Sequence, residues 1–278
     1  MDPIASLALI VLVWFVFYGT LKLLKVERPD LEISPFYALF KSTKLNSFIT
    51  RLATWNPGFW RILGNIGVVL SIGEAAFATW LLGGNLLRFL FLPGEATPVQ
   101  PLIPGVTIGI QSLPWFLLAA GIVILTHELS HGIQCVLEGI KVKSSAILVA
   151  VITFGGAVEP DEEELKAAPL MSKLRVFASG SVVNLILGLF ILALLISVGK
   201  YIPPQLNIFF SWLYFVSVNL AIMNMLPIGP LDGGQMWRAL TLDMKMGKNL
   251  QAIATYGFIA LIMGNIIFSM SIFGLIPL

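Results

Sequence analysis

The sequence is poor in charge, cysteine and histidine. Charged residues make up 12% of its 278 positions, about half of the roughly 25% found in soluble domains. The single Cys135 excludes an internal disulfide and does not report the redox compartment. The net charge of +2 comes without a dense basic cluster, so we expect no nucleic acid partner.

Apolar sequence takes the place of charge, with 57% hydrophobic residues and a mean hydropathy of +0.91. A helix needs about 20 mostly apolar residues to cross a bilayer. Six stretches approach or exceed that length: Ile4–Leu24, Ile62–Leu82, Trp115–Leu137, Val176–Val198, Ile208–Leu226 and Ile253–Ile272. We therefore expect an all-α polytopic protein of the cell membrane, with about six transmembrane helices in a lipid bilayer. The first stretch lacks a basic start and a small-residue cleavage site, which favours a retained span over a signal peptide.

Lysine and arginine alternate between the segments that join these stretches. Seven lie in Lys22–Arg61, none in Leu92–Pro114, five in Lys141–Arg175, one in Gly199–Asn207 and three in Pro227–Asn249. Positive residues collect in cytoplasmic loops. The alternation therefore predicts that the first, third and fifth segments are cytoplasmic and that both termini lie outside.

Two short segments do not fit a transmembrane helix. Pro104–Ile110 and Ser144–Pro160 are rich in β-branched residues and bounded by Gly and Pro. The apolar part of the second, about ten residues, is too short to span as a helix. We expect short β-strands or re-entrant pieces that are buried against protein. Pro160–Lys166 reads as a solvated helix start with Asp161 as its cap.

Both histidines lie in one motif, "LTHELSHGIQ" at Leu125–Gln134, within the third apolar stretch. On a helix, His127 and His131 are about 40° apart around the axis and about 6 Å apart along it. Two imidazoles at this spacing can bind one zinc ion at about 2.0–2.1 Å. Glu128 lies beside such a metal and can take a proton from bound water. H-E-x-x-H on a helix is the metalloprotease arrangement.

The alternative reading of a histidine in a membrane span is a structural hydrogen-bond partner. Three ionisable groups within five residues, however, would cost several kcal/mol in hydrocarbon unless they were paired or metal-bound. We therefore expect one Zn²⁺ per chain. Cys135 shares the histidine face and could be a ligand, but we interpret it as a small buried apolar residue.

A catalytic zinc usually has three protein ligands and one open position. With no further histidine, Asp232 is the favoured third ligand, because it lies at the depth of the histidines where the fifth stretch ends. Prolines and glycines there argue against a regular helix: Pro227, Gly229, Pro230, Gly233 and Gly234. The alternative for Asp232 is a turn-capping residue before the glycine pair.

The other acidic residues are weaker candidates. Glu138 is too far along the same helix to share the ion. Glu159 and the run Asp161–Glu164 read as solvent-facing, with Glu159 a less favoured ligand. Glu74 lies within the second apolar stretch, where it is either a hydrogen-bonded helix contact or a functional group.

These motifs together resemble the site-2 protease family of intramembrane zinc metalloproteases. The resemblance rests on "HELSH", on "NMLPIGPLDGG" at Asn224–Gly234, and on "SGSVVN" at Ser179–Asn184. The second is similar to the family pattern Asn-x-x-Pro-x-Pro-x-x-Asp-Gly, with Gly229 in place of the second proline. The third is similar to Gly-x-x-x-Asn, with Ser181 in place of the usual proline. The resemblance covers about residues 115–237.

The resemblance implies that His127, His131 and Asp232 hold zinc and that Glu128 is the catalytic residue. Asn184 would bind the substrate backbone or the oxyanion. Transmembrane protein substrates would be cut toward the cytoplasmic side, as in regulated intramembrane proteolysis. We expect a single transmembrane domain over residues 1–278, a catalytic core at about 115–237, and no PDZ or CBS domain of the kind that some relatives carry.

The substrate must unwind before its carbonyl reaches the metal, and the predicted strands Pro104–Ile110 and Ile147–Phe154 are candidates to pair with it. The alternative function is a non-proteolytic membrane zinc protein, either a transporter or a sensor. Transport would need a path of polar residues across the membrane, and the sequence offers few besides Glu74, Asn184 and Asn219. Prenyl-protein proteases and structural zinc sites are further alternatives.

Overall fold

The fold is dominated by six long apolar helices. The computed structural model describes residues 3–26, 28–150 and 154–274. Within these residues, six helices are long and apolar enough to cross a membrane: α1 (Pro3–Leu23), α3 (Pro57–Phe91), α4 (Leu113–Leu137), α6 (Leu170–Val198), α7 (Pro204–Asn224) and α9 (Gly247–Phe273). The prediction of six transmembrane helices is confirmed. The helix α3 is much longer than its apolar stretch, at 35 residues.

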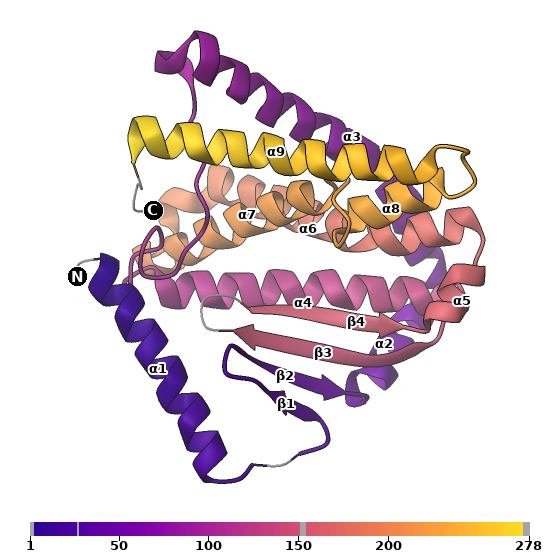
Figure 1. Cartoon of the computed structure of the whole chain (residues 1–278). Helices are drawn as coiled ribbons and strands as arrows, with labels where there is room; N and C mark the ends of the chain where they lie inside the picture. The colour runs from indigo at the N-terminus through magenta and orange to yellow at the C-terminus, as the bar shows by residue number, and fades with distance from the viewer. Residues whose placement is uncertain (1–2, 27, 151–153, 275–278) are drawn as a thin grey trace.

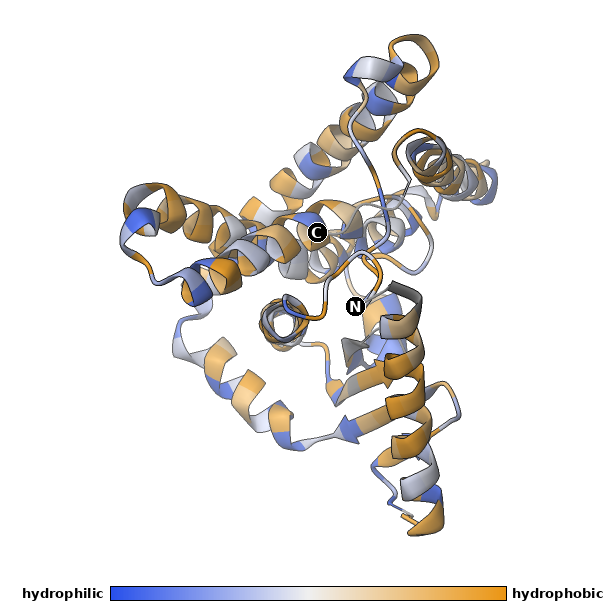
Figure 2. Ribbon diagram, turned by 90° about the vertical axis from the view of Figure 1, so that its left-hand side faces the viewer, coloured by the Kyte–Doolittle hydropathy of each residue, from blue (hydrophilic) through white to orange (hydrophobic). Residues whose placement is uncertain are grey.

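The helices carry apolar side chains on their outer faces as well as between them. Leu12, Val69 and Ile196 are 60%, 69% and 77% exposed, and hydrophobic residues recur along the helices in Figure 2. In water such a surface would drive association, whereas in a bilayer it faces lipid tails. The chain is a multi-pass membrane protein.

A small antiparallel sheet lies against α4 (Figure 1). Its strands, in spatial order, are β1 (Leu31–Ile33), β2 (Tyr37–Ser42), β3 (Val142–Ala150) and β4 (Phe154–Pro160). The predicted strand segment Ser144–Pro160 therefore forms a hairpin. Within the predicted strand Ile147–Phe154, residues 151–153 lie outside the described residues. The first two strands come from the segment before α3, and the sequence analysis predicted no strands there.

The position of each strand in the sheet decides which one can accept another strand. β3 is paired on both sides, because Ala38 lies opposite Val149 and Ala157 lies opposite Ala146. In the described part of the chain, β4 is paired only with β3, and its other edge faces α4.

The prediction of a strand at Pro104–Ile110 is wrong. Only a single bridge, between Pro104 and Ile108, forms there. The backbone N–H groups of residues 106–108 all donate to one acceptor, the carbonyl of Ile103. None of them is therefore free to pair with a neighbouring strand. Thr107 and Ile108 are 0% exposed, which confirms the expectation that this segment is buried against protein.

Shorter helices connect the spans. They are α2 (Lys44–Trp55), α5 (Glu162–Ala167), α8 (Asp232–Thr241) and two single 3₁₀ turns, η1 (Pro93–Glu95) and η2 (Gly199–Tyr201). Asp161 caps α5 as predicted, since its carboxylate accepts from the N–H groups of Glu163 and Glu164 at 3.0 and 3.1 Å. These bonds, with Lys143 at 3.2 Å, hold the pKa of Asp161 below its ordinary value.

The expectation that the glycines after Asp232 preclude a regular helix is wrong, because α8 begins at Asp232 and includes Gly233 and Gly234. The irregular backbone is confined to residues 225–231. A Cβ at Gly233 would collide with the backbone of Met225, and one at Gly234 with the backbone of Ile228. The two glycines let the turn pack directly on the start of α8.

The spans pack around α6, which contacts α3, α4 and α7. A buried polar network also ties α9 to α3. The Asn85 amide donates to the side-chain oxygen of Asn265 at 3.0 Å, and Asn265 donates to the Leu82 carbonyl at 3.0 Å. Asn85 also pairs with both backbone groups of Thr97. Because α9 packs on α8, this network supports the helix that carries Asp232.

We expect Asn265→Ala to lower the free energy of unfolding by about 1–3 kcal/mol, because it leaves buried polar groups without their partner. Thermal unfolding in detergent would measure the change. The control is Asn219→Ala, which removes an exposed side chain that donates to the Phe215 carbonyl of its own helix. Equal effects of the two substitutions would contradict the role of the network.

Candidate metal centre

Three residues that the sequence singled out converge at one place. His127 and His131 lie on α4, and Asp232 opens α8. His127 Nε2 lies 3.0 Å from His131 Nε2 and 3.1 Å from Asp232 Oδ2, and His131 Nε2 lies 3.2 Å from the same oxygen. All three side chains are largely buried, with exposures of 5%, 12% and 18%.

The triangle of ligand atoms fits a zinc ion. Ligands at about 2.0–2.1 Å from a tetrahedral zinc are separated from one another by about 3.3 Å, close to the three distances observed. Two imidazole nitrogens and a carboxylate oxygen are also the donor types that zinc accepts. Among the described residues this is the group of histidine, cysteine and acidic side chains that could hold a metal.

Glu128 follows His127 and is held by the sheet. Its Oε2 accepts from the Val158 N–H of β4 at 2.8 Å. The approach is close, because a Cβ at Gly156 would lie 3.0 Å from Glu128 Cγ. The edge of β4 that faces α4 therefore sets the position of this carboxylate beside the candidate metal ligands.

Helix α6 supplies the outer partners of both histidines. The Val176 carbonyl lies 2.7 Å from His131 Nδ1, and the Asn184 amide lies 3.0 Å from His127 Nδ1. Between them, Gly180 faces the His127 ring, since a Cβ there would lie 2.6 Å from both ring nitrogens. The predicted residue Asn184 is thus at the centre, in contact with a metal-ligand candidate.

Asn224 is a member of the site that the sequence reasoning did not assign. Its Nδ2 lies 3.1 Å from His127 Nε2, at the triangle of ligand atoms. It stands at the C-terminal end of α7, immediately before the irregular turn. The signal was present, because Asn224 opens the motif "NMLPIGPLDGG".

The remaining candidates lie outside the metal group. Cys135 is 1% exposed and packs with Ile140, Val142 and Val176, as expected for an apolar role. Glu138 pairs with Arg175 at 3.1 Å, and Glu159 accepts from Ser144 at 2.6 Å.

Glu74 is 6% exposed, and neither carboxylate oxygen has a hydrogen-bond partner among the described residues. The interpretation of Glu74 as a hydrogen-bonded helix contact is therefore wrong for the described part of the chain.

An apolar groove lies along the N-terminal half of α4, next to the site. Its volume is about 830 Å³, and it lies between α1, α4, α7 and the end of β3. Trp14, Phe116, Ile124, Val149 and Val216 are among its lining residues. Ile124 and Glu128 are four residues apart on α4, so the groove runs along the same helix face toward the catalytic candidate.

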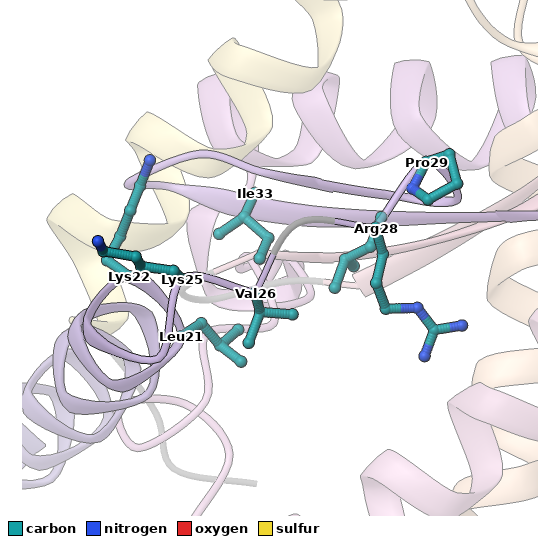
Figure 3. A pocket seen from close by; sticks show the side chains of 8 residues that line it. Leu21, Lys22, Lys25, Val26, Arg28, Pro29 and Ile33 are labelled. Atoms are coloured by element: carbon teal, nitrogen blue, oxygen red, sulfur yellow. The ribbon is translucent and has the colours of Figure 1, made fainter.

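A second hollow, of about 480 Å³, lies at the C-terminal end of α1. Figure 3 shows that the ammonium groups of Lys22 and Lys25 lie on one side of it and the Arg28 guanidinium on the other. Arg28 is paired with Asp30 at 2.8 Å. The cations do not converge, and this hollow is separate from the metal ligands.

Comparison with known proteins gives a family match. The profile of Peptidase family M50 matches residues 115–207 and 196–265, together more than half of the chain. Similar proteins include the "Membrane-bound transcription factor site-2 protease homolog" of Arabidopsis thaliana, 25% identical over 212 residues, or 74% of this chain. The "Putative zinc metalloprotease Rip3" of Mycobacterium tuberculosis is 31% identical over 147 residues, or 50% of this chain.

The "Putative zinc metalloprotease sll0528" of Synechocystis is 27% identical over 217 residues, or 76% of this chain. The aligned part covers 39%, 35% and 48% of these three relatives. The chain thus spans a third to a half of the length of the relatives it matches.

We expect Gly180→Ala to displace the His127 ring, because the added methyl group has no room beside it. Overpacking of this kind costs about 1–3 kcal/mol, and bound zinc per purified chain should fall. Gly257→Ala on α9 is the control, since a Cβ there meets nothing within 4 Å. Zinc retained in Gly180→Ala at the level of the control would show that the ring does not depend on this glycine.

Proposed function

Because the chain belongs to Peptidase family M50, the site-2 protease family, we propose that it is a zinc metalloprotease that hydrolyses transmembrane substrate proteins within the membrane. The observation that carries this proposal is the triangle of His127, His131 and Asp232 atoms, 3.0–3.2 Å apart, with Glu128 beside it. A structural zinc site does not need a carboxylate beside its ligands, so the position of Glu128 favours a catalytic site.

The chemistry divides between the metal and the protein. Bound zinc would supply a Lewis acid, which polarises a carbonyl and lowers the pKa of water toward about 7. Glu128 takes the proton of the attacking water and passes it to the leaving amine. Its Oε2 is held by Val158 N–H at 2.8 Å, which leaves Oε1 for the proton. The Asn224 amide, at the ligand triangle, donates to the oxygen of the scissile carbonyl.

The site lies toward the cytoplasm in this proposal. The motif falls past the midpoint of α4, which runs inward if the basic segments are cytoplasmic. Both termini then lie outside, and the sheet and α8 lie at the cytoplasmic side. Cleavage would release the cytoplasmic part of the substrate.

The substrate helix docks in the apolar groove between α1, α4 and α7. The groove is lined almost wholly by apolar residues, as suits a transmembrane segment that leaves the lipid. A helix satisfies its own backbone groups, so it must unwind to present a carbonyl to the metal. The edge of β4, rather than the doubly paired β3, accepts the unwound segment as an added strand.

No observation favours the alternative of a zinc transporter or sensor. The helices are apolar between the site and the N-terminal end of α4. The core between α4 and α7 there consists of residues such as Phe116, Val123 and Trp212. Transport would need polar groups along that path.

The proposal is tested with purified protein in detergent and a transmembrane peptide substrate. We expect Glu128→Gln to lose cleavage while it keeps zinc, because the amide cannot accept the proton. Asp232→Ala should lose both. The control is Glu163→Gln in α5, whose carboxylate is exposed. Cleavage by Glu128→Gln at the parent rate would rule out the proposed catalysis.

Filling the groove should slow cleavage without loss of zinc. Gly121 lines the groove, and a Cβ there meets nothing within 4 Å, so Gly121→Phe can place a ring where the substrate lies. Gly73→Phe on α3 is the matched control, because its surroundings are also open but it lies outside the groove. If both variants cleave the transmembrane peptide equally fast, the substrate does not use this groove.

A further inference from the structure

We propose that Asn184 is a positioning residue for the metal, whose side-chain carbonyl oxygen accepts the Nδ1–H of His127 and thereby fixes the tautomer that binds zinc through Nε2. This role differs from the contact with substrate or oxyanion that the family resemblance implies. It rests on the proposed zinc site, and it deepens that proposal by assigning what holds the first ligand.

The contact is buried and short. Asn184 is 0% exposed and His127 is 4% exposed. The Asn184 amide nitrogen lies 3.0 Å from Nδ1, on the side of the ring opposite to the ligand triangle. The amide therefore lies behind the ring, where it touches the ligand and not the position of a substrate carbonyl.

The protonation of the imidazole decides which end of the amide faces the ring. A neutral imidazole has one N–H, and the nitrogen without the proton is the ligand. With Nε2 at the metal, Nδ1 carries the proton and needs an acceptor. The only acceptor of an asparagine side chain is Oδ1, while its NH₂ group is a donor. An NH₂ group facing Nδ1 would favour the tautomer that cannot bind the metal.

Turning the amide by 180° breaks no other hydrogen bond. The Asn184 Oδ1 is buried and has no partner among the described residues, so nothing holds it away from His127. The two ends of an amide have nearly the same size, and their assignment follows from the hydrogen-bond network. With the oxygen toward Nδ1, the histidine proton and the amide oxygen satisfy each other.

The second histidine shows the same arrangement with a different acceptor. His131 Nδ1 lies 2.7 Å from the Val176 carbonyl, an acceptor that has no alternative orientation. Val176, Gly180 and Asn184 follow one another at intervals of four on one face of α6. Helix α6 thus gives each histidine an acceptor for Nδ1, and its glycine leaves room for the ring between them.

The test measures zinc affinity of the purified full chain by competition with a chelator. Asn184→Ala should weaken zinc binding by about 10–100-fold, the usual effect of losing such a partner. Asn184→Asp keeps an acceptor and should bind zinc as tightly as the parent or tighter. The control is Ser181→Ala on the same helix, a 0% exposed residue whose hydroxyl has no partner among the described residues.

Two results, from this titration and from a cleavage assay of the same variants, would overturn the inference. Unchanged zinc affinity in Asn184→Ala, with cleavage lost, would assign Asn184 to the substrate. Loss of zinc in Asn184→Asp, equal to that in Asn184→Ala, would show that the acceptor is not what matters. If the parent itself holds no zinc and cleaves no peptide, the proposed function fails and this inference fails with it.

A spectroscopic readout identifies the tautomer directly. The chain has only two histidines, so ¹⁵N labelling of histidine gives two pairs of ring signals. In the zinc-loaded parent we expect both Nδ1 atoms to be protonated. In Asn184→Ala the His127 Nδ1 signal should shift, while that of His131 stays as an internal reference. An unprotonated His127 Nδ1 in the zinc-loaded parent would contradict the proposal.

Discussion

The structure depends on one constraint: three polar side chains inside an apolar helix bundle must each have a hydrogen-bond partner or a metal ion. A histidine or carboxylate in hydrocarbon costs several kcal/mol unless it is paired or bound to metal. Here the two imidazoles and Asp232 face one another at 3.0–3.2 Å. Groups of α6 contact the Nδ1 atoms of both histidines. The close helix packing at Gly180, Gly233 and Gly234 is what brings these groups together.

The helices and the sheet position different groups of this centre. The helices α4 and α8 carry the candidate ligand atoms and α6 contacts the outer histidine nitrogens, whereas β4 holds Glu128 through the Val158 N–H. In Figure 1, β4 lies along α4 on the side away from α6 and α7. The apolar groove beside α1 lies along the N-terminal half of α4 and ends at Ile124, one helical turn before Glu128.

What the sequence predicted well was local. Spacing along a single helix defines the pair His127 and His131, and length and hydropathy define the six spans. The rest depends on contacts between distant segments. The pairing of β2 with β3 joins residues about a hundred positions apart, and short strands before α3 carry no apolar alternation that would indicate it. Pro104–Ile110 has strand composition, but its N–H groups find a nearer acceptor. The position of Asn224 beside His127 could not be predicted, because it depends on how the turn after Asn224 folds.

The most direct test of the central claim is X-ray absorption at the zinc edge of the purified parent protein. The account predicts about one zinc per chain, with two imidazoles and oxygen ligands at about 2.0–2.1 Å and no sulfur. This spectrum would be that of a site made by His127, His131 and Asp232. A sulfur ligand would place Cys135 in the site, and a chain that binds no zinc would remove the metal centre on which the proposed activity rests.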